Sequence, residues 1–276
     1  MPVRIVQSKQ NAWVKELRHA LAHPTNCGFA GVEGPNLVGE ALRAGLRFEC
    51  VFAALGAEKL LEALHLPPEF EVLLVSKPLL DTVLTTETPQ PIAALIEPPA
   101  WKWADLLNPD RTQPPLFVVL AGLQDPGNLG TILRSAEAFG AAGVLSLPGT
   151  VSAWNPKAVR ASAGSVFRIP LLSVSTDECF TRLRQAGIRL WTTAPSGAKP
   201  ANLVQLSGPA SLLIGNEGSG VPAELASRAD GVITIPCPGP VESLNAAVAA
   251  SVLLYEASRQ RSAPSGGRSA HRGDRR

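Results

Sequence analysis

The stretch Asp125–Arg134, which reads DPGNLGTILR, decides the fold predicted for this chain. It follows a short apolar run, Leu116–Ala121, that predicts a buried strand, and a helical pattern then continues to Phe139. The stretch is therefore a turn from a strand into a helix. Its glycines and proline allow close approach of the backbone and leave the first helical amides free, which favours an anionic partner such as phosphate. Arg134 is then either a functional cation or a charge on a solvated face.

Strand and helix patterns alternate on both sides of this turn, over residues 116–261. The strands are nearly continuous apolar runs, which is typical of a parallel sheet covered by helices on both faces. Ligands of such sheets bind at the carboxyl ends of the strands, so the loops after strands matter most. Strands are expected at 143–147, 167–172, 188–193, 210–214 and 232–235, and helices at 128–139, 156–162, 176–186, 222–228 and 243–260.

Residues 1–98 predict a smaller α/β domain in front of this sheet. Residues 99–115 are rich in proline and lack a period, so we interpret them as a linker whose Trp101 and Trp103 pack against one domain. Residues 262–276 are rich in Gly and Ser and basic, which predicts a disordered tail. In the small domain, helices are expected at 9–21, 35–44, 58–64 and 78–84, and strands at 29–32, 50–54, 71–75 and 92–96.

Composition excludes several classes of protein. The chain has 276 residues, is 45% hydrophobic and carries a formal net charge of +2, so it can bury a sizeable core. Its 4 cysteines are far apart and lack the spacing of a zinc site or a disulfide framework, so we expect no metal. No segment has a leader pattern or the roughly 18–20 apolar residues that span a bilayer, so a cytoplasmic protein is expected.

Two further loops follow expected strands. Leu213–Pro222 (LIGNEGSGVP) is a glycine-rich turn that permits close approach of a ligand, and Glu217 supplies a carboxylate there. Ile235–Ser251 (IPCPGPVESLNAAVAAS) is a stiff proline turn leading into a helix that Glu242 or Ser243 would cap. Either loop alone is compatible with an ordinary connection.

Together the three loops contain NxGTIxR, IGNEGxGxP and IPxxGxxxSLNxxxA, and this set resembles the three motifs of the SpoU (TrmH-like) family of the SPOUT superfamily, over residues 118 to about 260. Residues 4–96 resemble, more weakly, the substrate-binding domain of many members, but they lack a common arginine before Gly28 and have Asn36 where arginine is common. The resemblance implies a trefoil-knotted parallel-sheet methyltransferase domain preceded by a small α/β (ribosomal protein L30e-like) domain. It also implies a homodimer whose active site draws on both subunits.

The activity that the resemblance implies is transfer of a methyl group from S-adenosylmethionine to a ribose 2′-hydroxyl of RNA. Carried over by motif position, the cofactor would lie on Thr193, Gly215, Ile235, Pro236 and Leu244, and the catalytic set would be Asn128, Arg134, Glu217, Ser243 and Asn245.

A ribose hydroxyl is a weak nucleophile, so the enzyme must hold it in line with the methyl group. Since a guanidinium with a pKa above about 12 rarely loses its proton, we expect Arg134 to stabilise the developing alkoxide and grip the adjacent phosphate. Asn128, Ser243 and Asn245 would orient Arg134 and the ribose. Glu217 would fix either Arg134 or its own loop.

Two other functions are compatible with parts of the sequence. Glycine turns after strands also occur in dinucleotide enzymes of Rossmann type, but the first turn lacks GxGxxG and the acidic residue that follows it. A non-catalytic RNA-binding or ribosome-assembly protein of the same fold would have no need of the five polar residues. The separate N-terminal domain favours ribosomal RNA, 23S rRNA in particular, over transfer RNA as the partner.

Overall fold

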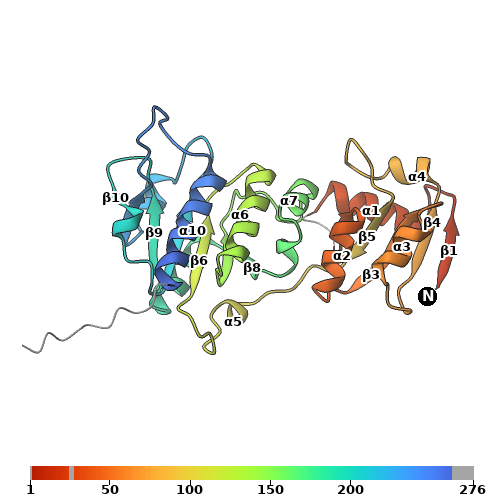
Figure 1. Cartoon of the computed structure of the whole chain (residues 1–276), viewed down its shortest axis with the longest axis horizontal. Coiled ribbons are helices and arrows are strands. Elements are labelled where there is room, and N and C mark those ends of the chain that lie inside the picture. The colour runs from red at the N-terminus through yellow and green to blue at the C-terminus, as the bar shows by residue number, and fades with distance from the viewer. Residues whose placement is uncertain (1, 25–27, 263–276) are drawn as a thin grey trace, which may run out of the picture.

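The structure is a computed structural model that describes residues 2–24 and 28–262. Two α/β units lie end to end along the long axis of the molecule (Figure 1). The segment that joins them carries one short helix, α5 (Trp103–Leu106). The tail predicted from residue 262 onward falls almost entirely outside the described residues.

The N-terminal unit has a mixed five-stranded sheet in the order β1-β4-β3-β5-β2. The pairs of β4 with β1 and β3 are parallel, and the pairs of β5 with β2 and β3 are antiparallel. Its elements are β1 (Val3–Val6), α1 (Ala12–Ala22), β2 (Ala30–Glu33), α2 (Pro35–Arg43), β3 (Phe48–Ala54), α3 (Glu58–Leu64), β4 (Val72–Val75), α4 (Lys77–Asp81) and β5 (Ile92–Ile96).

The C-terminal unit has a seven-stranded sheet in the order β10-β12-β9-β11-β6-β7-β8. Every pair in it is parallel, which confirms the predicted parallel sheet. Its elements are β6 (Leu116–Leu120), α6 (Pro126–Ala138), β7 (Gly143–Ser146), α7 (Pro156–Ala161), η1 (Ser165–Phe167), β8 (Leu171–Ser173), α8 (Thr176–Gln185), β9 (Arg189–Thr193), β10 (Lys199–Pro200), η2 (Ala201–Leu203), β11 (Ala210–Ile214), α9 (Ala223–Ala226), β12 (Gly231–Thr234) and α10 (Ala246–Ser262).

Helices cover both faces of this sheet. α6, α7 and α10 contribute to one buried apolar cluster, and α8 contributes to the cluster on the opposite side. Trp103 joins the second cluster, and its indole N–H donates to Glu178 at 2.7 Å, so this tryptophan packs against the C-terminal unit as expected. The strand order places β12, β9, β11 and β6 side by side, so the loops after β6, β11 and β12 meet at one edge of the sheet. A trefoil knot depends on how the chain passes through its own loops, which strand order does not decide. The knot therefore stays a prediction.

Several predicted boundaries were wrong. α6 begins at Pro126 because the Asp125 carboxylate accepts a hydrogen bond from the Asn128 amide at 2.8 Å. α10 begins at Ala246 rather than at 243, since Asn245, and not Glu242 or Ser243, accepts hydrogen bonds from the first free amides of this helix. The strand expected at 167–172 starts only at Leu171, after a turn of 3-10 helix.

Candidate active site

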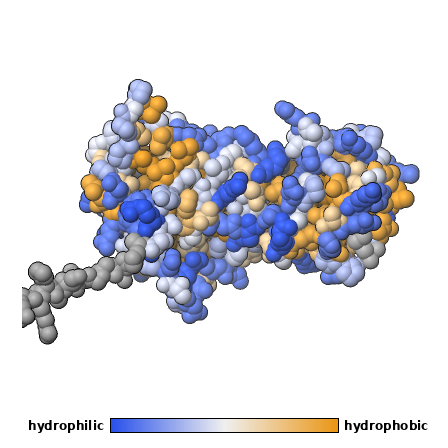
Figure 2. Space-filling view, in the orientation of Figure 1, coloured by the Kyte–Doolittle hydropathy of each residue, from blue (hydrophilic) through white to orange (hydrophobic). Residues whose placement is uncertain are grey.

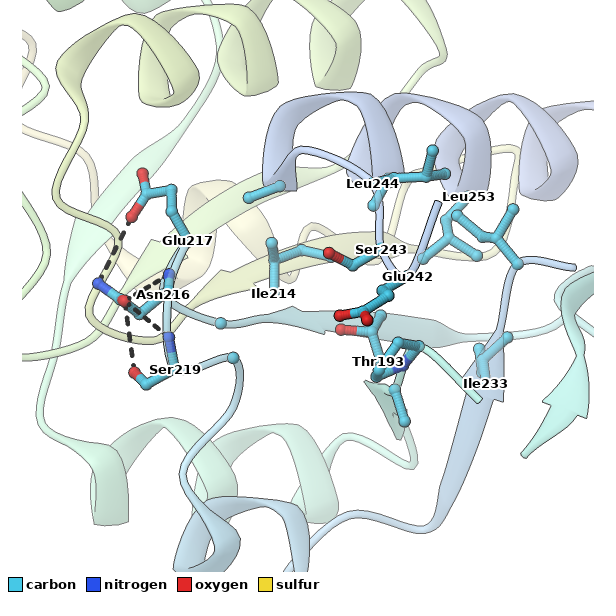
Figure 3. Close-up of a pocket in the computed structure, with 18 of the residues that line it drawn as sticks. Thr193, Ile214, Asn216, Glu217, Ser219, Ile233, Glu242, Ser243, Leu244 and Leu253 are labelled. Carbon is cyan, nitrogen blue, oxygen red and sulfur yellow. Dashed lines mark hydrogen bonds between the residues drawn. The ribbon is translucent and has the colours of Figure 1, made fainter. Parts of the chain in front are cut away.

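The second and third loops, together with Ala194 and Pro195 after β9, enclose a cavity of about 310 Å³ at the carboxyl edge of the parallel sheet (Figure 3), and the loop Asp125–Arg134 does not line it. Strands β9, β11 and β12 supply its floor through Thr193, Ile214 and Ile233. The loop after β11 forms one wall, and the loop before α10, including Ser243 and Leu244, forms the other. A cavity of this size at this edge is a typical small-molecule site of a parallel sheet.

A chain of side-chain hydrogen bonds joins the three loops beside the cavity. The Asn128 amide donates from Nδ2 to Glu217 Oε1 at 3.0 Å, and Asn245 Nδ2 donates to Asn128 Oδ1 at 3.0 Å. Asn245 Oδ1 in turn accepts from the amides of Ala247 and Val248 at the start of α10. The structure therefore brings Asn128, Glu217 and Asn245 together, as the predicted catalytic set requires.

Glu217 is the acceptor on which this network converges. Its carboxylate also accepts hydrogen bonds from the backbone amides of Gln124 at 3.2 Å and Asp125 at 3.0 Å. Burial acts to raise the pKa of Glu217, but the hydrogen bonds from Asn128 and the two amides outweigh it, so the pKa lies below its usual value. Glu217 therefore holds the loop that begins α6, and within the described chain no hydrogen bond or ion pair joins it to Arg134.

The glycine turn after β11 is held by tight backbone packing. A Cβ on Gly215 would lie 2.1 Å from the carbonyl carbon of Gly220, so no larger residue fits there. Asn216 closes the turn, since its Oδ1 accepts from the amides of Gly218 and Ser219 while its Nδ2 donates to the Gly122 carbonyl at 2.9 Å. Asn216 was given no role from the sequence, although it lies inside the second motif.

Four of the five residues predicted to hold the cofactor line the cavity: Thr193, Gly215, Ile235 and Leu244. Pro236 does not, because it is exposed between Ile235 and Cys237, both of which line the cavity. Of the predicted catalytic residues, Ser243 and Glu217 also line it. Thr193 uses its hydroxyl to donate to the Leu213 carbonyl at 3.2 Å, so it ties β9 to β11 at the cavity floor.

The charges around the cavity favour a cationic ligand. Its lining contains Glu217 and Glu242 and no lysine, arginine or histidine, and because the Glu217 carboxylate turns away toward Asn128, Glu242 supplies the negative charge (Figure 3). Within the described chain, Glu242 has no hydrogen bond or ion pair to compensate its charge. Such a cavity fits a ligand with a sulfonium and an ammonium group, and it offers no cation to the pyrophosphate of a dinucleotide. Glu242 was seen only as a possible helix cap in the sequence.

Arg134 is not joined by a hydrogen bond or ion pair to the other four members of the predicted set in the described chain. It is exposed on α6, and no hydrogen bond or ion pair joins it to another residue of the described chain. A different cation, Lys157 of α7, reaches the loop that Glu217 holds, with its Nζ 2.9 Å from Asp125 Oδ2. This contact lowers the pKa of Asp125. Lys157 carried no signal in the sequence, since its approach depends on how α7 packs on α6.

Within residues 2–24 and 28–262, no group of three or more His, Cys, Asp or Glu side chains is arranged to hold a metal ion. No helix of the same residues is both long and apolar enough to cross a membrane. Burial raises the pKa of the Cys179 thiol to about 12, so this cysteine is an unreactive member of the core.

A parallel sheet with a glycine-walled, anionic cavity and a polar network at its carboxyl edge defines a group-transfer enzyme that binds a small cationic cofactor. Residues 115–255 match the SpoU rRNA Methylase family, and residues 32–101 match the domain described as RNA 2′-O ribose methyltransferase substrate binding. The chain belongs to the SpoU family, and it is an S-adenosylmethionine-dependent RNA ribose 2′-O-methyltransferase. The dinucleotide and non-catalytic alternatives were wrong.

Relatives match over nearly the whole chain. The 23S rRNA (guanosine(2553)-2′-O)-methyltransferase RlmP of Bacillus subtilis is 32% identical over 91% of this chain and 97% of that protein. The AdoMet-bound rRNA methyltransferase of Sinorhizobium meliloti is 31% identical, with a TM-score of 0.79 over 93% of this chain and 98% of that one. The AdoMet complex of the SpoU methyltransferase AviRb from Streptomyces viridochromogenes is 30% identical, with a TM-score of 0.82 over 91% and 98%.

Proposed function

We propose that this protein methylates a ribose 2′-hydroxyl of 23S ribosomal RNA in the cytoplasm, without a metal ion. The observation that carries the choice of RNA is the match to RlmP, which extends over both units and 97% of that protein. In this proposal residues 1–98 bind the RNA, residues 99–115 link the units and residues 116–261 carry out the transfer. Residues 262–276 contribute only sequence-independent phosphate contacts.

The cofactor would occupy the cavity on Thr193, Gly215, Ile235 and Leu244, and when bound it supplies an electrophilic methyl group on its sulfonium. Glu242 would face its positive charge. Glu217 holds Asn128, and Asn128 holds Asn245, so the polar edge of the cavity is preorganised before RNA arrives. Ser243, at the mouth of the cavity, would orient the ribose. None of these groups needs to move during the transfer.

The position of Arg134 supports a homodimer in which this residue acts in the partner subunit's cavity. α6 and α10 lie side by side, joined by the hydrogen bond between the hydroxyls of Ser135 and Ser251 at 2.7 Å (Figure 1). Exposed apolar residues follow the outer side of α10 at helical spacing, at Val248, Val252 and Tyr255. Apolar side chains gather at the surface over the N-terminal end of this helix (Figure 2).

An apolar stripe beside an exposed arginine is suited to pairing with a second copy, since burial of the stripe in a two-fold interface carries the arginine onto the other subunit. There Arg134 would grip the phosphate next to the target ribose and stabilise the developing alkoxide. Its guanidinium stays protonated throughout, and the proton of the hydroxyl leaves to solvent.

The proposal is tested by methyl transfer in vitro. Purified protein, S-adenosylmethionine with a labelled methyl group, and either unmodified 23S rRNA or unmodified transfer RNA are combined, and the labelled nucleotide is identified by nuclease resistance of its 3′ phosphodiester. We expect label at one ribose of 23S rRNA and none on transfer RNA. Label on transfer RNA alone, or on a base, would contradict the proposal.

A further inference from the structure

The two units are joined by an ion-pair network that the methyl transfer does not use. Arg168, which follows η1, reaches residues of both units. Its Nη1 donates to Glu40 of α2 at 2.5 Å, and its Nε and Nη2 donate to the two carboxylate oxygens of Glu137 at 2.6 and 3.0 Å. Arg168 therefore binds the Glu137 carboxylate in a bidentate way, the geometry that the planar guanidinium group favours.

We infer that Arg168 is an interdomain positioning residue, which fixes the RNA-binding unit relative to the helix that carries Asn128 and Arg134. Glu137 lies in the last turn of α6, one turn beyond Arg134. Glu40 lies in α2, inside the segment that matches the family's substrate-binding domain. One side chain thus joins the element that presents the catalytic groups to the domain that holds the substrate.

The packing around Arg168 indicates that its contact with Glu40 is a fixed part of the structure. Gly164 has a φ of +89°, and a Cβ there would lie 2.7 Å from Cβ of Glu40, so Glu40 rests directly against this backbone. Arg43 pairs with Glu40 from its other side at 2.5 Å. The network Arg43–Glu40–Arg168–Glu137 alternates in sign and is neutral overall, and the side chains of Glu40, Glu137 and Arg168 are each no more than 35% exposed.

The protonation of the network agrees with this geometry. The pKa of Glu40 is lowered, chiefly by the hydrogen bond from Arg43 and also by Arg168. Burial acts to raise the pKa of Glu137, but the hydrogen bond from Arg168 outweighs it and the pKa lies below its usual value, so both carboxylates stay charged near neutral pH. Beneath the network, the largest buried apolar cluster contains residues of both units, so the ion pairs fix the orientation of an interface that is already packed.

Fixing the two units matters because the RNA would contact both. When two binding surfaces are held at the right spacing, the second contact forms without a further loss of freedom, and the affinity for a folded RNA rises. Loosening the contact should weaken RNA binding while the cofactor cavity, which lies wholly in the C-terminal unit, is unaffected. The consequence for RNA rests on the proposed function, but the contact between units does not.

The test compares Glu40→Gln with Glu97→Gln, a matched control whose ion pair with Arg47 at 3.1 Å stays inside the N-terminal unit. We expect Glu40→Gln to raise the KM for RNA about three- to fivefold, with the dissociation constant of S-adenosylmethionine unchanged, and Glu97→Gln to change neither. Arg168→Gln should raise the KM at least as much, and Glu40→Gln should add nothing further to it because both remove the same contact. The inference would be overturned if the two substitutions raised the KM by factors that multiply in the double variant, or if Glu40→Gln alone left the KM at its wild-type value.

A second readout needs no RNA. Fluorescent labels on the exposed Lys59 of the N-terminal unit and the exposed Lys199 of the C-terminal unit report the distance between the units by energy transfer in the isolated protein. We expect Glu40→Gln to broaden this distance distribution and Glu97→Gln to leave it unchanged. An unchanged distribution for Glu40→Gln refutes the interdomain contact, whereas a broadened distribution in a protein that methylates no RNA refutes the proposed function alone.

Discussion

Glu217 organises the polar side chains of the site through the charged form of its carboxylate. It accepts hydrogen bonds from the side chains of Asn128 and Asn216 and from two backbone amides of the loop that begins α6. Each of these donors needs an acceptor, and both carboxylate oxygens of Glu217 can accept. A glutamine at this position would place an NH2 donor where one of these oxygens lies, so it would face another donor. The residue therefore supports both the fold of the loop and the position of Asn128.

Glu217→Gln should lower the melting temperature at pH 7 by about 2 °C, and the difference should shrink below about pH 4. The sign follows from the lowered pKa, because stability gained from such a carboxylate is present above its unfolded pKa and is lost as the pH falls through its folded pKa. Melting curves from pH 3 to pH 8 check this. Glu224→Gln, on the exposed start of α9, is the control and should leave the melting temperature at pH 7 unchanged.

Arg134→Ala should lower kcat/KM for methyl transfer about 10²- to 10³-fold, because in the proposed mechanism Arg134 is the cation that stabilises the developing alkoxide. Calorimetry should find the dissociation constant of S-adenosylmethionine nearly unchanged, since Arg134 does not line the cavity. Arg134→Lys should recover part of the rate, because the lysine ammonium restores the positive charge but not the planar, bidentate donors of the guanidinium. Activity of Arg134→Ala within a few-fold of wild type would refute the assignment.

Glu242→Gln should weaken the binding of S-adenosylmethionine several-fold, because it removes the carboxylate of the cavity that has no partner within the described chain. The loss should exceed the loss in affinity for S-adenosylhomocysteine, which has no sulfonium charge. Calorimetry with both ligands measures the two losses, and Glu224→Gln again serves as control. Equal affinity of the variant and the wild type for S-adenosylmethionine would exclude the role given to Glu242.

At the scale of elements, α6 packs closely against α7. Gly130 permits this contact, because a Cβ there would lie 2.4 Å from the Ala158 carbonyl oxygen and 2.5 Å from Cβ of Ala161. The glycine of the first motif is thus explained by helix packing as well as by the turn. A shift of α6 would displace Asn128 and Arg134 together.

Gly130→Ala should destabilise the protein by about 1–3 kcal/mol, since backbone and methyl groups cannot yield without moving the helix. Urea unfolding measures the change. Gly208→Ala is the matched control, because a Cβ on Gly208 would meet nothing within 4 Å. A destabilisation no larger than that of Gly208→Ala would show that α7 accommodates the methyl group.

Periodicity predicted the long helices and the buried strands but failed where few residues are buried. β1 was missed because only Val6 of its four residues is buried, while Val3 and Ile5 of this edge strand stay exposed. The start of α10 was misplaced because Glu242, Ser243 and Asn245 can all cap a helix, and only the packed loop selects Asn245. β10 and η2 are too short to carry a period.

For the site, the three motifs predicted which loops converge but not how each side chain is used. The order of strands β9, β11, β6 and β12 follows from no local pattern, yet it is what brings Asn245 within 3.0 Å of Asn128. That Arg134 takes no part in this network depends on how α6 packs against its neighbours, which its local sequence does not determine.

For the whole molecule, the exposed stripe on α10 is the surface on which the proposed dimer depends. Val252→Glu should shift the protein from dimer to monomer, because it places a carboxylate in the centre of the stripe formed with Val248 and Tyr255. Light scattering after size exclusion measures the mass. Val232→Glu, at an exposed position on β12 away from the stripe, should remain a dimer. A dimer that survives Val252→Glu would place the interface elsewhere.

The central claim is that this chain methylates one ribose of 23S rRNA through Arg134. The measurement that tests it most directly is a map of 2′-O-methylated riboses across all ribosomal and transfer RNA in cells that lack the protein, complemented with wild type or with Arg134→Ala. We predict that one methylated ribose of 23S rRNA disappears without the protein, returns with the wild type and does not return with Arg134→Ala. An unchanged 23S map, or loss of a transfer RNA site instead, would contradict the claim.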